Sequence, residues 1–122
     1  MKDNKSIKTT YENAARLHAK ASAVGNYKTA NKQVNILRGI YRDIEKRKIE
    51  NIILLELLED DDISIKAWAA AHLLGLKFEI DKAITVLQHI KSLIGKTTEE
   101  KLVIFGSKKV LEVWEKRGFL KF

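Results

Sequence analysis

The sequence predicts an all-α protein of about six helices that pack in antiparallel pairs. The 122 residues contain no proline and only six glycines, so few residues interrupt a helix. Apolar residues recur at helical spacing along the chain, and the short connections between segments favour antiparallel neighbours. The length suits one domain with its own core, residues 1–122, and is too short for two.

The first predicted helix runs from about Thr10 to Val24. Thr9 and Glu12 have the spacing of a capping box, in which the threonine caps the helix and the glutamate bonds back to it. Gly25 is expected to end this helix. Residues 1–9 are therefore predicted to form a frayed tail.

The second predicted helix, from Tyr27 to about Lys48, is the most regularly amphipathic segment of the chain. Asn26 precedes it as a good N-cap. One side of this helix is apolar and carries Ala30, Val34, Leu37, Tyr41 and Ile44. The opposite side is polar and mostly basic, with Lys28, Lys32, Asn35, Arg42 and Lys46.

Two further segments, from Ile49 to Glu59 and from Ile63 to Leu76, are apolar on several sides. A helix of this kind is buried between neighbours, so these two are predicted to form the centre of the fold. Four consecutive acids, Glu59–Asp62, join them in a tight turn. Asp60 or Asp62 can cap the second of the two helices, whose N-terminus favours negative charge.

The fifth helix is predicted to begin with Asp81 as its cap and to end near Ile94, closed by Gly95. Thr97 and Glu100 repeat the capping-box spacing ahead of a last helix that ends at Gly118.

Gly106 leaves two alternatives for residues 102–106. The region forms either part of a kinked helix or a short extended segment, with a helix beginning near Ser107. The apolar residues after the last helix are expected to fold back onto the core: Phe119, Leu120 and Phe122.

The segment LLELLEDDDISIKAWAAAHLL, residues 54–74, resembles a HEAT-type repeat. It has the leucine-rich helix, the aspartate in the turn, the branched and basic residues, and the Ala-Ala and Leu positions of that repeat: Leu57, Leu58, Asp60, Ile65, Lys66, Ala69, Ala70, Leu73 and Leu74. Together with AVGNYKTANKQVNILRGIY, VLQHI and LEVWEKRG, the chain is similar to a family of small bacterial domains of unknown function with a HEAT-like, armadillo-superfamily fold. The resemblance implies a right-handed helical stack.

The net charge of +7 is unevenly distributed. Residues 1–48 carry twelve basic and four acidic side chains, residues 49–62 carry six acids and no base, and residues 63–122 carry eleven bases and six acids. The chain has no cysteine, which excludes disulfides and fits a reducing compartment. Neither a signal peptide nor an apolar run of membrane-spanning length occurs, so we expect a cytoplasmic protein without a membrane partner.

Two charged surfaces are candidate partner-binding sites. The basic row of the second helix (Lys28, Lys32, Arg42 and Lys46) has the charge that phosphate binding requires, although any solvated helix face also has this pattern. The acidic turn, including Asp61 and Asp62, can bind a basic partner or a divalent cation, although helix capping explains it equally.

Catalytic and metal-binding patterns are missing from the sequence. His18, His72 and His89 lie on different predicted helices, without the spacing of metal ligands. Packing is the favoured interpretation of His72 beside Trp68, with a pocket at that point as the alternative. We therefore expect neither an enzyme nor a cofactor.

The predicted function is protein–protein interaction, for example as an immunity or adaptor protein, because HEAT-like stacks present extended binding surfaces. The alternative is a nucleic-acid-binding module that uses the basic face of the second helix. An enzyme such as a HEAT-like DNA glycosylase is the third and least favoured hypothesis.

Overall fold

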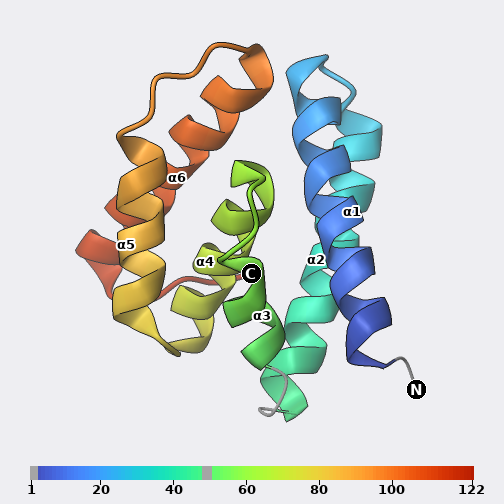
Figure 1. The fold of residues 1–122 in the computed structure, drawn as a ribbon, viewed down its shortest axis with the longest axis vertical. Coiled ribbons are helices and arrows are strands. Elements are labelled where there is room, and N and C mark those ends of the chain that lie inside the picture. The colour runs from blue at the N-terminus through green and yellow to red at the C-terminus, as the bar shows by residue number, and fades with distance from the viewer. Residues whose placement is uncertain (1–2, 48–50) are drawn as a thin grey trace.

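A computed structural model describes residues 3–47 and 51–122, and within these ranges the chain forms six helices and no strand (Figure 1). The prediction of an all-α fold is confirmed. The helices are α1 (Asn4–Ala23), α2 (Tyr27–Arg47), α3 (Asn51–Leu57), α4 (Ile63–Leu76), α5 (Ile80–Lys91) and α6 (Thr98–Arg117).

Helix α4 is the centre of the fold. It packs against α1, α3, α5 and α6, while α1 also packs along α2. Ile65, Leu73 and Leu74 of α4 are completely buried, as are Leu54 and Leu57 of α3. Helix α4 spans Ile63–Leu76, so the predicted bounds of this segment are confirmed. Its surface is apolar on every side, and such a helix is stable only when neighbouring helices bury it.

Helix α1 begins earlier than the sequence indicated. Asp3 is its N-cap, and the carboxylate accepts a hydrogen bond from the Ser6 backbone N–H at 2.8 Å. The predicted start at Thr10 is wrong, and residues 4–9 are helical rather than a frayed tail. Ile7 packs against the core, which supplies the burial that keeps this first turn in place.

Helix α5 also departs from its predicted bounds. Asp81 lies in its first turn instead of capping it, because the backbone turns through the left-handed region at Lys77 and Glu79 and the helix resumes at Ile80. The helix ends at Lys91, whereas Ile94 is 91% exposed and lies in the loop.

The boundaries of α6 follow its capping chemistry. The Thr97 hydroxyl accepts from the Glu100 N–H at 3.0 Å, and the Glu100 carboxylate accepts from the Thr97 N–H at 3.0 Å. The helix continues through Gly106, which decides between the two alternatives for that region, and ends at Gly118 with a φ of 70°.

The predicted ends of the first three helices agree in part with the structure. Gly25 has a φ of 74°, and the Asn26 side chain accepts a hydrogen bond from the Thr29 N–H, so the α1–α2 turn is as predicted. Helix α3 ends at Leu57, two residues before the predicted end. The predicted end of the second helix at Lys48 and the predicted start of the third at Ile49 lie outside the described residues.

The chain after α6 folds back across the core. The Phe122 ring lies 5.0 Å from the Tyr41 ring and 4.7 Å from the His72 ring, centroid to centroid. Leu120 also packs against the core, whereas Phe119 is exposed. The predicted fold-back is therefore confirmed for two of its three residues.

Candidate functional site

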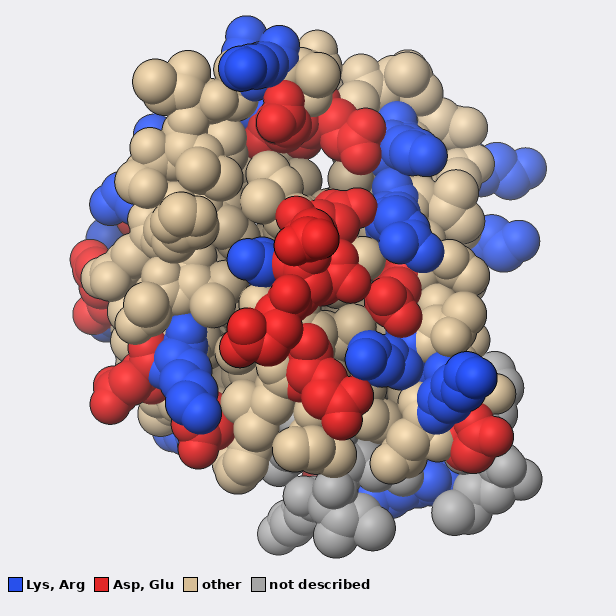
Figure 2. Space-filling view, in the orientation of Figure 1, with Lys and Arg blue, Asp and Glu red and all other residues tan. Residues whose placement is uncertain are grey.

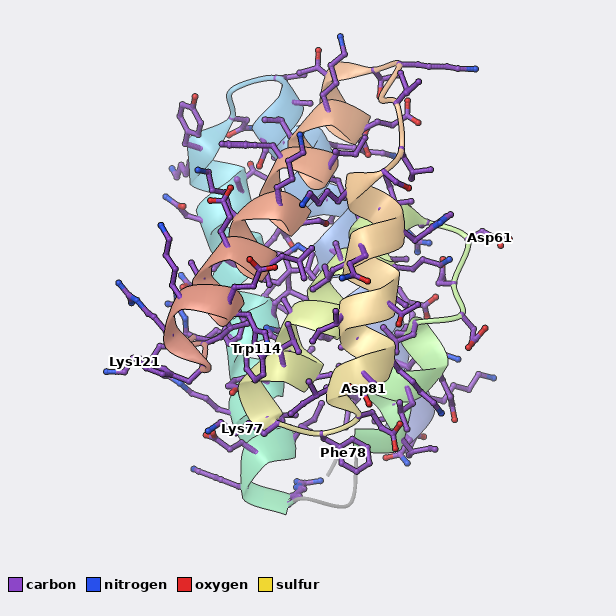
Figure 3. All side chains as sticks on the ribbon, turned by 90° about the vertical axis from the view of Figure 1, so that its left-hand side faces the viewer. Asp61, Lys77, Phe78, Asp81, Trp114 and Lys121 are labelled. Atoms are coloured by element: carbon purple, nitrogen blue, oxygen red, sulfur yellow. The ribbon has the colours of Figure 1, made fainter. Side chains whose placement is uncertain are left out.

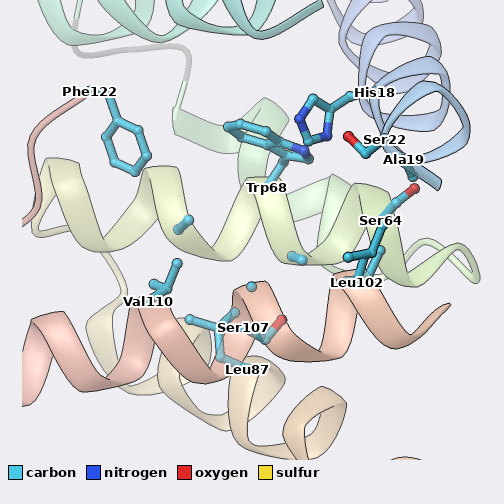
Figure 4. Close-up of a pocket in the computed structure, with 14 residues that line it drawn as sticks. His18, Ala19, Ser22, Ser64, Trp68, Leu87, Leu102, Ser107, Val110 and Phe122 are labelled. Carbon is cyan, nitrogen blue, oxygen red and sulfur yellow. The ribbon is translucent and has the colours of Figure 1, made fainter. Parts of the chain in front are cut away.

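A pocket of about 380 Å³ lies between α1, α4 and α6, closed at one end by Phe122 (Figure 4). Its lining is almost entirely apolar. The lining residues are His18, Ala19 and Ser22 of α1; Ser64, Ala67, Trp68 and Ala71 of α4; Leu87 of α5; Leu102, Val103, Gly106, Ser107 and Val110 of α6; and Phe122.

Small side chains create this space. Helix α4 turns Ala67 and Ala71 toward the pocket, and α6 contributes Gly106 at the same level. A Cβ atom added to Gly106 would meet no other atom within 4 Å, so the glycine borders open space rather than a close helix contact. The pocket therefore exists because small residues on facing helices leave the volume between them unfilled.

Trp68 and His18 form one wall of the pocket. Their ring centroids are 5.2 Å apart and the rings are nearly perpendicular, an edge-to-face contact. His18 is half-buried, and this burial lowers the pKa of its imidazole below the usual value, so the ring is neutral at pH 7. A neutral imidazole offers one hydrogen-bond donor and one acceptor.

Ser107 is one of the polar residues that line the pocket. Its side chain is 1% exposed, and its hydroxyl oxygen has no hydrogen-bond partner among the described residues. The hydroxyl of Ser64, in contrast, donates to the Asp62 carboxylate at 2.6 Å and is satisfied within the protein. A buried hydroxyl without a partner costs about 1–3 kcal/mol of stability, and the open space of the pocket does not reach this oxygen.

An aromatic cluster around His72 lies next to the pocket and shares two of its lining residues. The Tyr11 hydroxyl lies 2.7 Å from His72 Nδ1, and Nε2 of the same ring is buried without a partner in the described part of the chain. Trp68 and Phe122 both contact this ring and also line the pocket. The packing interpretation of His72 is confirmed; the pocket beside it is formed by its neighbours.

The four predicted cations of α2 lie away from the pocket. Lys28, Lys32, Arg42 and Lys46 are all exposed, and at 3.6 residues per turn they fall within an arc of about 80°. They therefore form a single stripe along α2, which we call the basic stripe. Asp43 is also exposed beside it.

Asp61 and Asp62 of the acidic turn differ in their environment. Asp62 is the N-cap of α4, and its carboxylate accepts the Ser64 N–H at 2.8 Å. Asp61 projects from the α3–α4 turn into solvent (Figure 3). Acidic side chains gather over α3 and this turn, with basic side chains of α1 beside them (Figure 2), and Lys8 forms an ion pair with Glu56 at 3.3 Å.

Sequence reasoning did not single out the residues of α6 that form the pocket. The sequence singles out Gly106 only as a possible break in a helix, not as a pocket residue. It singles out neither Ser107 nor Leu102, because their importance depends on how α6 lies relative to α1, more than 80 residues earlier.

The described part of the chain brings together no group of His, Cys, Asp or Glu that could hold a metal ion. Among the helices described, none is long and apolar enough to cross a bilayer. No family model matches the sequence, and it has no significant match among curated proteins or solved structures.

Proposed function

We propose that the protein is a protein-binding module and that its partner inserts an apolar side chain into the pocket between α1, α4 and α6. The observation that carries this proposal is the preformed apolar volume of about 380 Å³. Binding sites of this kind are concave, mostly apolar and equipped with a few polar groups. Interface hot spots are likewise bulky side chains seated in desolvated pockets.

The rim of the pocket supports a protein partner. Leu102 lines the pocket and is 43% exposed, and Trp68 and Val110 beside it are only partly buried. An apolar surface that continues from the pocket onto the outside of the helices can contact the backbone and neighbouring side chains of the inserted group.

The proposal also includes the type of helical stack and the cellular location of the protein. From the sequence resemblance, we propose that the six helices form a HEAT-like right-handed stack of antiparallel pairs, related to small bacterial domains. We place the protein in the cytoplasm because the chain has no cysteine, and we propose that it acts by binding rather than by catalysis.

Two matched glycine substitutions test the proposal. Gly106→Phe fills the pocket from its own wall, and Gly39→Phe adds the same ring to a second helical glycine whose Cβ also meets nothing within 4 Å. Each variant and the natural protein would be immobilised and exposed to an extract of the native host, with bound proteins quantified by isotope-coded mass spectrometry.

The expected result is a host protein bound by the natural chain and by Gly39→Phe but lost with Gly106→Phe. A protein that binds all three baits, including Gly106→Phe, does not depend on the pocket and does not support the proposal. If no bound protein depends on Gly106, the pocket does not recruit a protein and the proposal is wrong.

The basic stripe favours nucleic-acid binding as a second candidate function. Its four cations are exposed on one side of one helix, which suits contacts to a phosphate backbone. Charge reversal of Lys28, Lys32 and Arg42 should then abolish duplex DNA binding measured by fluorescence anisotropy and reduce its salt dependence. Affinity unchanged by the triple reversal would eliminate this candidate.

A further inference from the structure

We infer that residues 119–122 regulate access to the pocket: they form a strap that closes one end of it and opens while the six helices stay folded. The inference rests on the proposed function, because it concerns the same pocket. It is carried by the contacts of Phe122, by the way the strap is attached, and by the buried ring of His72 that Phe122 covers.

Phe122 closes the pocket and also covers the aromatic cluster. Its ring lines the pocket (Figure 4) and lies 5.0 Å from the Tyr41 ring and 4.7 Å from the His72 ring, centroid to centroid. Tyr41 and His72 are buried, whereas Phe122 is partly exposed, so the phenyl ring lies between this pair and solvent. Displacement of Phe122 therefore lengthens the pocket toward Tyr41 and His72.

Gly75 gives Phe122 a defined seat on α4. A Cβ atom at this glycine would lie 2.9 Å from Phe122 Cε2 and 2.8 Å from the Tyr41 hydroxyl oxygen, so the phenyl ring rests against bare backbone. A side chain at this position would compete with the ring for the same space. The closed position of the strap is therefore specific, as a gate requires.

The attachment of the strap permits it to open alone. Gly118 ends α6 with a φ of 70°, and residues 119–122 beyond it make no backbone hydrogen bond to any described residue. Leu120 packs against the core and Phe122 against the aromatic cluster, whereas Phe119 is exposed. A segment with few apolar contacts and no backbone hydrogen bonds opens at a lower free energy than the helices it covers.

His72 makes the closed strap less stable than its apolar contacts alone would make it. Nε2 of this ring is buried and has no hydrogen-bond partner among the described residues. An unpaired polar atom destabilises the state that buries it. Opening of the strap admits water to the ring, so hydration of Nε2 offsets part of the contact that Phe122 loses.

The test measures how often His72 becomes accessible in the intact protein. Diethyl pyrocarbonate modifies neutral imidazoles, and an imidazole in contact with water at pH 7.5 is mostly neutral. His18, His72 and His89 lie on different tryptic peptides, so mass spectrometry follows each of them separately, and the exposed His89 serves as the internal reference. The labelling rate of His72 is measured in the natural protein, in Phe122→Ala and in Phe119→Ala, at several urea concentrations below the unfolding transition.

We expect the labelling of His72 in the natural protein to be nearly independent of urea, because a local opening exposes little surface. Phe122→Ala should accelerate this labelling by about 10-fold or more, since the loss of a partly buried phenyl ring shifts the opening equilibrium by that factor. Phe119→Ala removes the same atoms from an exposed position and should change the rate by less than about twofold.

Two results would refute the strap as a gate. One is that His72 reacts only through global unfolding, with a rate that rises by about fivefold or more per molar urea. The other is that Phe122→Ala and Phe119→Ala change the labelling rate equally, which would mean that Phe122 does not seal the ring.

The host-extract experiment links the strap to binding. Phe122→Ala should retain more of the host protein that depends on Gly106 than the natural protein does, because its pocket is open. Lower retention would mean that Phe122 belongs to the docking surface, and would refute regulation by the strap. Urea-dependent labelling of His72 refutes the strap alone, whereas the absence of any host protein that depends on Gly106 refutes the proposed function.

Discussion

The hydroxyl of Tyr11 lies 2.7 Å from Nδ1 of His72, and both side chains are completely buried. This hydrogen bond links α1 to α4 across 61 residues of sequence. Whichever side chain donates, His72 Nε2 has no partner within residues 3–47 and 51–122, so the ring is hydrogen-bonded there through Nδ1 alone. The pair therefore fixes the position of α1 against the helix at the centre of the fold.

Tyr11→Phe should destabilise the protein by about 1–3 kcal/mol, because it leaves a buried imidazole nitrogen unpaired without changing the packed ring. Urea unfolding followed by circular dichroism measures the change. Tyr27→Phe is the control, since Tyr27 is 72% exposed and the loss of its hydroxyl should change the free energy of unfolding by less than about 0.5 kcal/mol. Equal effects of the two substitutions would show that the hydrogen bond contributes nothing.

The second prediction concerns pH. Burial lowers the pKa of His72 from its usual 6.5 to about 3 in the folded protein. Below pH 6.5 the unfolded chain therefore binds a proton that the folded chain does not, and stability falls as the pH decreases from about 6.5 toward 3. Between pH 7.5 and pH 5 the His72 contribution should be a loss of about 2 kcal/mol.

The control for this pH effect is the double variant Tyr11→Phe, His72→Leu. It removes the titrating ring and its hydrogen-bond partner together, so no unpaired polar atom replaces them. Other groups titrate equally in both proteins, and the difference between the two urea denaturation series isolates His72. Parallel stability curves from pH 7.5 to pH 5 would contradict the burial of a neutral imidazole.

Local patterns explain which elements could be predicted from the sequence. Helix α4 and the capping box of α6 follow from residues within a few positions of each other, and both were placed correctly. The start of α1 was not, because Asp3 and Thr9 are both acceptable caps, and the packing of Ile7 against the core decides between them.

The pocket illustrates what local patterns cannot supply. Its walls come from helices that are distant in sequence, and its volume is the space between these helices that their side chains leave empty. Gly106 and Ser107 look like ordinary surface positions of an amphipathic helix until α1 is placed opposite them. The basic stripe, in contrast, was predictable because four exposed cations on one helix require no tertiary information.

The third prediction concerns Gly75, which lies where Phe122 and Tyr41 approach α4. A Cβ atom there would lie 2.8 Å from the Tyr41 hydroxyl oxygen and 2.9 Å from Phe122 Cε2. Gly75→Ala should therefore destabilise by about 1–2 kcal/mol, since overpacking exceeds the gain in helix propensity. Gly39→Ala, in open space, should stabilise by up to about 1 kcal/mol. Stabilisation by both substitutions would show that Phe122 does not pack on α4.

The last prediction compares two of the three aspartates of the acidic turn, Asp61 and Asp62. Asp62 accepts hydrogen bonds from both the backbone N–H and the hydroxyl of Ser64, at 2.8 and 2.6 Å, and so caps α4. Asp62→Ala should cost about 1 kcal/mol of stability, as removal of an N-cap does, whereas Asp61→Ala at the exposed tip should cost less than about 0.5 kcal/mol. The two variants lose the same charge, so the comparison removes any effect of net charge on folding. Thermal and urea unfolding at pH 7 measure both, and equal values would mean that charge, rather than capping geometry, determines the contribution of the turn.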